Sequence, residues 1–538
     1  MPPPPKATGK PARTTGLNHW MKQVLEECDH ASANFDADAV HDLRVALRRC
    51  RSMADGLRAI DPDPEWKAMK KAGKQLFQRL GDLRDVQVMM EWIEKVHPIS
   101  SSTLSGDSHA SSSTTPEQYE QSSSEQNSKP ASGAPPNSSR DSVAQTLLDI
   151  LSEREKEQKR EARSALEEFD RKQWRQWSKS LPMRAAKIRP GSALFKHLAL
   201  ERWTEARQLH ATALRNRSQS ALHALRIGIK RFRYIVENFL PAEHKTWSED
   251  LKHMQDMLGE IHDLDVLWST AQTCHVFPDQ ASRNSWHARI LEERNTRIIS
   301  YREKMVGSNS LWHVWRDGLP KGRQVQVLAT RRMKLWANTL DPDFVHSEHV
   351  ATLALELFDG LRKGEFLPSL DGDARSALQI AALLHDVGKF KGNKGHHKAS
   401  LELIKSCNAP LGWKTGDMRR AATIARFHCG ALPTRSHKAL RDLQPDEQKI
   451  TIQLAAILRL ANALDAAHDG QIRKVTVEKE TAGNHHAGRP ACVVVEAEGY
   501  SSRNHVARTT AAERYLLETV LRRPVLIKPM KIAADLSS

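Results

Sequence analysis

Two stretches of this chain repeat one pattern of apolar and basic residues, and this repeat constrains the fold more than any other feature. VHDLRVALRRCRSM at residues 40–53 matches LHALRIGIKRFRYI at residues 222–235. Further along, LGDLRDVQV at residues 80–88 matches LGEIHDLDV at residues 258–266. Both matches keep the same order and nearly the same separation along the chain, which indicates a duplication. The sequence therefore predicts two related modules.

The spacing of apolar residues predicts that both modules are helical. From residue 17 to about residue 318 the chain is rich in Ala, Leu, Glu, Lys, Arg and Gln at helical spacing, and a second helical block runs from about residue 324 to 469. After it, IRKVTVEKE, ACVVVEAEG and PVLIKP are typical of short strands, with a helix at residues 511–521. We predict a mostly α fold with a few short C-terminal strands.

Two segments have the composition of disordered chain. Residues 98–140 are dominated by Ser, Pro, Gly, Gln and Asn, and they interrupt the first copy of the repeat. Such a segment cannot bury enough apolar surface to offset the entropy of ordering it. We predict a disordered spacer there and a disordered tail at residues 1–16, which open MPPPPKATGKPARTTG.

Charge and hydropathy restrict the partners and the location. Lys and Arg outnumber Asp and Glu by 81 to 65, which gives a net charge of +16 and a pI near 9.5. This charge predicts a polyanionic partner, for which nucleic acid, an anionic membrane surface and inorganic polyphosphate compete. The mean hydropathy is −0.58, and no apolar run approaches the roughly 20 residues that insert in a membrane. Six cysteines without a C-x-x-C pair, and an N-terminus without an apolar leader, predict a cytoplasmic protein.

Each copy of the repeat carries a basic stripe along one helix face. Positions i, i+3, i+7 and i+10 share a face, and they hold a histidine followed by three cations in both copies: His41, Arg44, Arg48 and Arg51, then His223, Arg226, Lys230 and Arg233. The opposite face of each helix is apolar and is predicted to be core. No acidic residue lies on either stripe, so the like charges repel unless an anion binds. Lys74 and Lys252 align between the copies and extend the basic surface.

These motifs resemble a known family. H-x-x-R-[VI]-x-[LI]-[RK]-R-x-R followed by LG-x-[LI]-[RH]-D, present twice at residues 17–318, resembles the CHAD domain, a histidine-containing helical domain of two antiparallel bundles. The resemblance implies that inorganic polyphosphate binds in a basic channel between the bundles, through the residues of the two stripes. It also implies association with polyphosphate granules.

The second helical block carries an ordered series of histidines with one aspartate. The series is His346, the adjacent His385 and Asp386, then His396 with His397, and finally His428. Imidazole with carboxylate suits a transition metal, whereas Mg²⁺ prefers oxygen ligands. The series therefore predicts a metal site.

The phrases around these residues resemble the HD phosphohydrolase superfamily. HDVGKF, GHHKASLELI, FHCGALPTRSH and ILRLANALDAAH are similar to the C-terminal HD-like domain of the exopolyphosphatase and guanosine pentaphosphate phosphatase family, over residues 324–530. The resemblance implies a divalent cation, Mn²⁺, Mg²⁺ or Fe²⁺, and Lys389 and Asp386 as catalytic residues, with Arg435 and His437 as phosphate contacts. The implied metal ligands are His346, His385, Asp386, His428 and Asp465.

Two departures from the HD pattern leave the activity open. Asn462 stands where the last helix of an active HD site supplies a metal-binding aspartate, and Cys429 stands where binuclear HD enzymes place a second histidine. Asparagine is neutral, so one anionic ligand is lost. The chain also has no glycine-rich phosphate loop between a strand and a helix, and exopolyphosphatase activity is not carried over.

The sequence leaves three possible functions open. The first is a polyphosphate-binding protein whose HD-like domain hydrolyses or only holds a phosphate compound. The second is a metal-dependent HD phosphohydrolase for nucleotides or phosphomonoesters, localised by the CHAD-like domain. The third, a nucleic-acid-binding scaffold, is disfavoured because the chain has only 5 Tyr and 12 Phe for base stacking. Residues 147–169 either pack within the bundle or pair between chains, so a homo-oligomer stays open.

Overall fold

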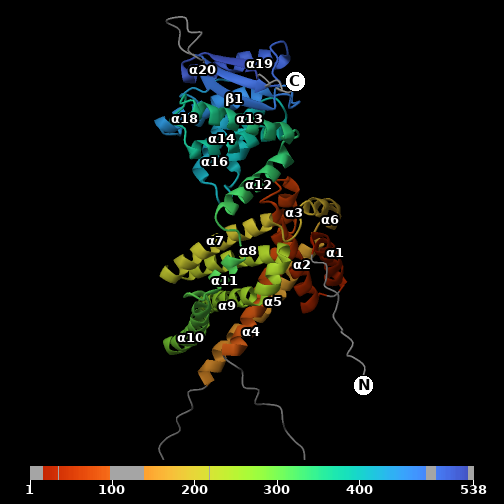
Figure 1. The fold of residues 1–538 in the computed structure, drawn as a ribbon. Helices are drawn as coiled ribbons and strands as arrows, with labels where there is room; N and C mark the ends of the chain where they lie inside the picture. The colour runs from red at the N-terminus through yellow and green to blue at the C-terminus, as the bar shows by residue number, and fades with distance from the viewer. Residues whose placement is uncertain (1–15, 34, 97–137, 217, 480–491, 531–538) are drawn as a thin grey trace, which may run out of the picture. The chain divides into compact units, whose positions relative to one another are not determined.

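The computed structural model describes residues 16–33, 35–96, 138–216, 218–479 and 492–530, drawn as a ribbon in Figure 1. The predicted disordered tail lies outside the described residues up to residue 15, and the predicted spacer lies outside them up to residue 137. The chain divides into two compact units. Unit 1 comprises Met1–Ser52, Ala68–Ala186 and Arg202–Arg316, and unit 2 comprises Met53–Lys67, Lys187–Glu201 and Asp317–Ser538.

Unit 1 consists of helices joined by turns and short loops, and no strand lies among its described residues. The end of α2 and the starts of α3 and α7 belong to unit 2. In chain order the helices are α1 (Leu17–Ala33), α2 (Ala37–Leu57), α3 (Pro64–Ala72), α4 (Lys74–Val96), α5 (Ser138–Glu167), α6 (Arg171–Ala185), α7 (Ala193–Asn216), α8 (Gln219–Phe239), α9 (Pro241–Thr273), α10 (Gln280–Met305) and α11 (Leu311–Asp317).

The duplicated motifs form equivalent helices. α2 and α8 carry the basic stripes, and the apolar face predicted for each is buried, including Leu43 in α2 and Ile229 in α8. A polar bridge joins the two helices, because Asn238 of α8 donates to Ser52 Oγ at 2.9 Å and accepts from Arg49 of α2 at 3.4 Å. The LG motifs lie in α4 and α9. The repeat in the sequence is therefore a repeat of helix pairs.

Residues 147–169, for which the sequence left two alternatives, pack within the bundle. Leu147 and Leu151 of α5 are fully buried in a core shared with α4 and α9. Along the same contact, Gln87 of α4 donates to Glu155 at 3.0 Å and Arg79 pairs with Glu161 at 2.7 Å. The apolar face of α5 is thus covered inside unit 1.

Unit 2 contains the remaining helices and a small sheet, so the predicted fold class is confirmed. Its elements are α12 (Arg323–Leu340), α13 (Phe344–Lys363), α14 (Gly372–Leu384), the 3-10 helix η1 (Val387–Lys391), α15 (His396–Ser406), α16 (Thr415–Arg426), α17 (Lys438–Arg441), α18 (Pro445–Leu464), β1 (Lys474–Lys479), β2 (Val493–Glu498), α19 (His505–Glu513), α20 (Tyr515–Leu521) and β3 (Val525–Pro529). Among the described helices, none has both the length and the apolar composition needed to cross a membrane.

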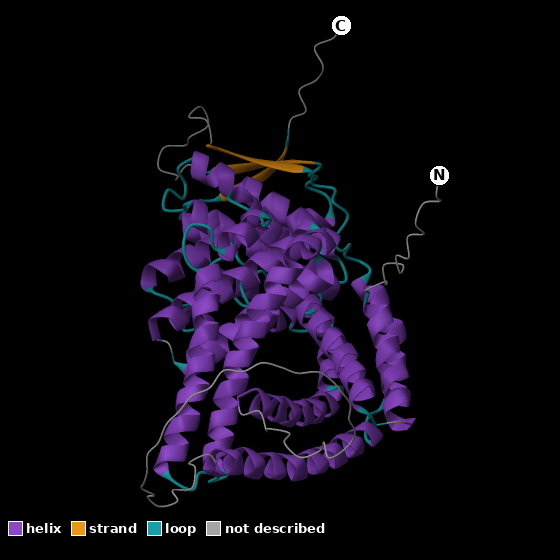
Figure 2. Cartoon of the chain, turned by 90° about the horizontal axis from the view of Figure 1, so that it is seen from below, coloured by secondary structure: helices purple, strands orange, loops and turns teal. Residues whose placement is uncertain are grey.

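The three strands form one sheet, drawn in orange in Figure 2, in the order β1-β2-β3. β1 pairs antiparallel with β2, with Val477 opposite Val495, and β2 pairs parallel with β3, with Val495 opposite Ile527. The parallel pair needs a crossover, which α19 and α20 supply. The helix predicted at residues 511–521 is in fact two helices, separated at Arg514.

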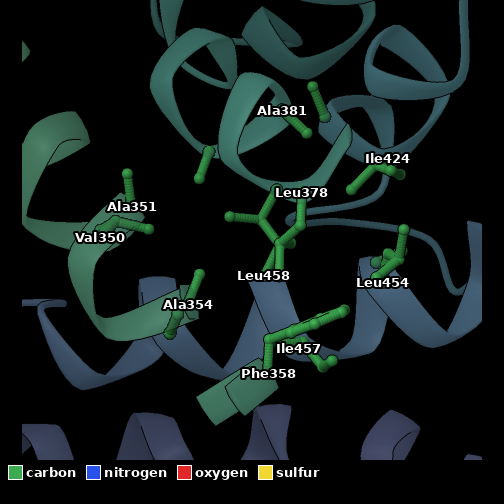
Figure 3. Packing of buried hydrophobic residues seen from close by; sticks show 14 of the residues in the cluster. Val350, Ala351, Ala354, Phe358, Leu378, Ala381, Ile424, Leu454, Ile457 and Leu458 are labelled. Carbon is green, nitrogen blue, oxygen red and sulfur yellow. The ribbon is translucent and has the colours of Figure 1, made fainter. Parts of the chain in front are cut away.

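The core of unit 2 lies among α13, α14, α16 and α18. Figure 3 shows Leu378 of α14 beside Leu458 of α18, with Phe358 of α13 and Ile457 close by. All four side chains are fully buried. Burial of large apolar side chains contributes about 1.5–3 kcal/mol each, so this core holds the helix ends that carry the histidines.

Candidate anion site and metal centre

A cavity of about 470 Å³ lies in unit 1 among α2, α4, α8 and α9. Five of the predicted polyphosphate contacts line it: Arg44, Arg51, Lys74, Arg226 and Lys230. The two basic stripes therefore supply cations to one space.

The cations of the cavity raise each other's electrostatic energy. Burial, and then the charges of Arg226, Arg48 and Arg44, lower the pKa of Lys230 to about 8. The Nε atoms of Arg44 and Arg48 are buried without a hydrogen-bond partner in the described part of the chain. A buried cation without a partner is costly. An anion in the cavity would therefore be stabilised by Arg44, which lines it, and by the nearby charge of Arg48.

Two aspartates from equivalent positions of the repeat also line the cavity. Asp85 of α4 and Asp263 of α9 are the last residues of the two LG-x-[LI]-[RH]-D motifs. Burial raises the pKa of Asp263 to about 6, although Arg226 opposes the shift. The sequence contains a signal for these residues, since the aspartate recurs in both copies, but the recurrence alone does not indicate a role.

The other predicted contacts lie in different surroundings. His41 and Lys252 are exposed, whereas Arg233 lies 3.8 Å from Glu237. His223 places its Nδ1 atom 3.3 Å from Nδ1 of His262, a lining residue of the cavity. Arg51 donates to the carbonyl of Lys70 at 2.6 Å while it lines the cavity.

In unit 2 the adjacent His385 and Asp386 follow the end of α14, where the backbone turns into η1. A Cβ atom at Gly388 would lie 2.1 Å from the carbonyl oxygen of His396 and 2.6 Å from the amide nitrogen of Ser400, so the turn requires glycine. Ser400 fixes the turn, because its hydroxyl donates to the carbonyl of His385 at 2.6 Å and accepts from the amide of Gly388 at 2.9 Å. The start of α15 is thereby held against the histidine-aspartate pair.

Asp386 lies at the centre of the site, and its two carboxylate oxygens face different groups. Oδ2 lies 2.5 Å from Lys389 Nζ and 3.3 Å from His385 Nε2. Oδ1 lies 3.2 Å from His396 Nε2 and 3.5 Å from His428 Nε2. The carboxylate therefore connects two groups of imidazoles.

Three imidazoles are oriented by the backbone. His385 Nδ1 lies 2.7 Å from the carbonyl oxygen of Ala382, and His428 Nδ1 lies 2.7 Å from that of Ala425. His396 makes the same contact to its local backbone at 2.8 Å. Since a carbonyl only accepts, each Nδ1 carries the proton and each Nε2 is directed toward Asp386. This arrangement is typical of metal-ligating histidines.

The fourth imidazole, His346 of α13, is held differently. Its Nδ1 atom lies 2.7 Å from Asp465 Oδ2, its Nε2 atom lies 3.0 Å from Asn462 Oδ1, and its ring stacks on His468 at 3.7 Å. Nε2 also lies 3.9 Å from Asp386 Oδ2. Asp465 thus contacts the side of the ring opposite Asp386.

The protonation of these groups follows from their contacts. Close contact with Asp386, and then with Cys429, raises the pKa of His396 to about 10. Burial, and then the charge of His385, hold the pKa of His428 well below its usual value. Burial opposes ionisation of Asp386, but contacts with His385 and His396 keep its pKa far below the ordinary value. On the Oδ1 side of the ionised carboxylate, His396 thus carries an extra proton and His428 does not.

The predicted phosphate contacts lie in different surroundings. Lys389 touches Asp386, as given above, whereas Arg435 is exposed. His437 caps a turn, with Nδ1 2.7 Å from Thr434 Oγ1. Their convergence on one phosphate stays a prediction.

Two groups of side chains in the described residues could hold a metal ion: His346, His385 and Asp386, and separately His396, His428 and Cys429. The sequence prediction included the first group and His428. His396 belongs to the series that predicts the metal site but is not among the implied ligands, and Cys429 is not among them either, although both lie within the motifs that carried the HD resemblance.

Known protein families match both halves of this arrangement. The model of the CHAD domain matches residues 16–272, and the model of Ppx/GppA phosphatase, domain III, matches residues 330–505. Among solved structures, the chain is similar to the crystal structure of the CHAD domain from the plant Ricinus communis, with 16% identity and a TM-score of 0.35, covering 56% of this chain and 90% of that one. No curated protein matches the chain. Both resemblances found in the sequence are thereby confirmed.

Proposed function

We propose that this chain, which joins a CHAD domain at residues 16–272 to a Ppx/GppA phosphatase domain III at residues 330–505, binds inorganic polyphosphate in unit 1 and hydrolyses or holds a phosphate compound in unit 2. Both domain families concern phosphate chemistry, which supports a phosphate- or polyphosphate-related function. We take the two domains to extend over residues 17–318 and 324–530.

The observation that carries the polyphosphate proposal is the convergence of cations from both repeats on one cavity. Arg44 of α2 and Arg226 and Lys230 of α8 line it together, and Arg48 adds its charge to theirs. Successive cations on each helix are about 5 Å apart along the axis. A condensed phosphate chain carries negative charge on every unit, so it would pair with cations from both helices at once.

Two features favour this ligand over duplex DNA. The cavity holds about 470 Å³, the volume of a sphere about 10 Å across, and a DNA duplex, whose major groove alone is about 12 Å wide, is too wide to enter it. The aromatic rings in the lining are those of Phe77 and His262, and two rings give little stacking surface for bases.

The class of ligand is tested by competition. We would measure equilibrium binding of long-chain polyphosphate to the full chain, with duplex DNA as competitor, across a series of salt concentrations. Affinity for either polyanion falls with salt because counterions are released, so preference near physiological ionic strength is the deciding quantity. We expect polyphosphate to be preferred. Equal competition by DNA would favour the nucleic-acid scaffold instead.

The second proposed activity uses the imidazoles and Asp386 of unit 2. These residues fit a divalent cation, because three Nε2 atoms are directed at one ionised carboxylate. When bound, such a cation would supply charge stabilisation and activation of water for phosphoryl hydrolysis. Lys389 lies at the same carboxylate and would bring a positive charge to the phosphate. This arrangement also supports the second function, hydrolysis of nucleotides or phosphomonoesters.

Two variants of unit 2 distinguish polyphosphate binding from hydrolysis of a phosphate compound. His385→Gln and Asp386→Asn change unit 2, so we expect polyphosphate affinity within about twofold of the parent chain and loss of any phosphate release. Phosphate release would be followed with polyphosphate, nucleotides and a phosphomonoester in turn. Turnover that survives both substitutions would contradict a catalytic role for this centre, and the site would then only hold phosphate.

A further inference from the structure

Asp386 divides the metal centre into two unequal halves. On the Oδ2 side, Lys389 Nζ lies at 2.5 Å, and Nε2 of His346 faces the neutral Asn462 at 3.0 Å. On the Oδ1 side lie His396, His428 and Cys429. A cation on the Oδ2 side would have to displace the ammonium group and would lack one anionic ligand. On the Oδ1 side an ion would displace protons, from His396 and from the thiol of Cys429, and not an ammonium group.

The spacing on the Oδ1 side matches a tetrahedral ligand set. Metal–nitrogen bonds of about 2.0–2.1 Å and metal–sulfur bonds of about 2.3 Å place tetrahedral ligand atoms about 3.3 Å apart for N and O and about 3.6 Å apart for N and S. His396 Nε2 lies 3.0 Å from His428 Nε2 and 3.7 Å from Cys429 Sγ. Asp386 Oδ1 lies 3.2 and 3.5 Å from the two nitrogens.

The Oδ1 side of Asp386 contains buried polar atoms that a bound ion would satisfy. Asp386 is 2% exposed, and its Oδ1 atom has no hydrogen bond of good geometry within the described ranges of the chain. The two facing Nε2 atoms both belong to rings whose Nδ1 protons are used by the backbone. A metal ion would satisfy the carboxylate oxygen and both nitrogens together.

The ligand types indicate which metal. Cys429 is partly exposed and free, so an ion can reach it from solvent. A soft sulfur ligand with two imidazoles suits Zn²⁺ or Fe²⁺, whereas Mg²⁺ and Ca²⁺ take oxygen ligands. The replacement of a histidine by Cys429, read in the sequence as a departure, thus becomes a determinant of metal choice.

We propose that unit 2 binds one borderline-soft divalent ion, Zn²⁺ or Fe²⁺, through His396, His428, Cys429 and the Oδ1 atom of Asp386, while Lys389 occupies the other oxygen. The proposal rests on the proposed function only because both concern the cation of the same centre. Metal binding is measured without substrate, so an inactive centre that binds the ion would overturn the hydrolysis proposal alone.

Cobalt substitution tests the thiolate directly. The metal-free full chain would be titrated with Co²⁺, whose bond to a thiolate gives a charge-transfer absorption in the near ultraviolet. We expect one ion per chain, tetrahedral visible bands and a near-ultraviolet band that Zn²⁺ abolishes and excess Mg²⁺ does not. Displacement by Mg²⁺, or two equivalent ions per chain, would overturn the proposal.

Substitutions identify the residue that gives rise to the charge-transfer band. Cys429→Ser should remove it and weaken Co²⁺ binding by more than the about 10- to 100-fold that loss of an outer-shell partner costs. The control Cys407→Ser, at another partly buried thiol of unit 2, should keep the band. Cys429→His should bind the ion without the band, which shows that the variant site is folded. A band that survives both substitutions at residue 429 would contradict the assignment.

Discussion

At the scale of single residues, the cavity of unit 1 is defined by charges that are unfavourable without a ligand. Lys230 shows this most clearly, because burial and the neighbouring guanidinium groups of Arg226, Arg48 and Arg44 lower its pKa to about 8. The carboxylates of Asp85 and Asp263 act in the opposite direction in the same space. The net charge of the cavity therefore changes with pH, at about pH 6 through Asp263 and at about pH 8 through Lys230.

The first prediction concerns the pH dependence of polyphosphate binding. A polyanion favours the charged form of Lys230, so the contribution of this ammonium is complete well below pH 8 and is lost as the pH rises through about 8. We expect affinity to fall by at most about tenfold per pH unit there. Lys230→Arg, whose guanidinium stays charged, should remove the decline. An equal decline in both proteins would show that another group titrates.

The second prediction concerns Asp263. Its carboxylate is ionised at about pH 7, since its pKa is about 6, and it repels a bound polyanion. We expect Asp263→Asn to strengthen polyphosphate binding about three- to tenfold at about pH 7, and less at about pH 5, where the acid is mostly protonated. Asp256→Asn, an exposed change on the same helix, is the control. Weaker binding by Asp263→Asn would mean that the aspartate orients Arg226 for the ligand.

At the scale of elements, the metal centre depends on the close approach of η1 to the start of α15. We predict that Gly388→Ala destabilises unit 2 by at least about 2 kcal/mol, because a Cβ would meet the backbone of His396 at 2.1 Å. Gly416→Ala, in open space in α16, should be neutral or stabilising by up to about 1 kcal/mol. Thermal unfolding measures both. Equal stability of the two variants would contradict the requirement for glycine at this turn.

Helical periodicity explains how much of these elements could be predicted. It separated the buried face of α2 and α8 from the basic face, since residues at i, i+3 and i+7 share a side. It could not show that α4 and α9 meet, and so the shared cavity of Asp85 and Asp263 was missed. The prediction of a single helix over residues 511–521 was wrong. Both α19 and α20 have helical composition, and no glycine or proline marks the break at Arg514.

At the scale of the whole molecule, both domain families were recognisable from short motifs. The order of the histidines predicted a centre around Asp386, and the structure brings His385, His396 and His428 to it. The sequence did not show that Lys389 and Cys429 lie at different oxygens of one carboxylate, because the direction of a side chain depends on tertiary packing. Only the structure therefore shows that the two sides of the Asp386 carboxylate are not equivalent.

The central claim is that cations from both repeats form one polyphosphate site. The most direct test compares two variants of the full chain that lose equal charge: Arg44, Arg48, Arg226 and Lys230 changed to alanine, against the exposed Lys22, Lys71, Arg231 and Lys245 changed to alanine. Equilibrium binding of long-chain polyphosphate would be measured near physiological ionic strength, with circular dichroism to verify folding. The account predicts that the first variant loses at least about 100-fold in affinity and the second less than about tenfold. Equal losses in the two variants would contradict it, since net charge alone would then explain binding.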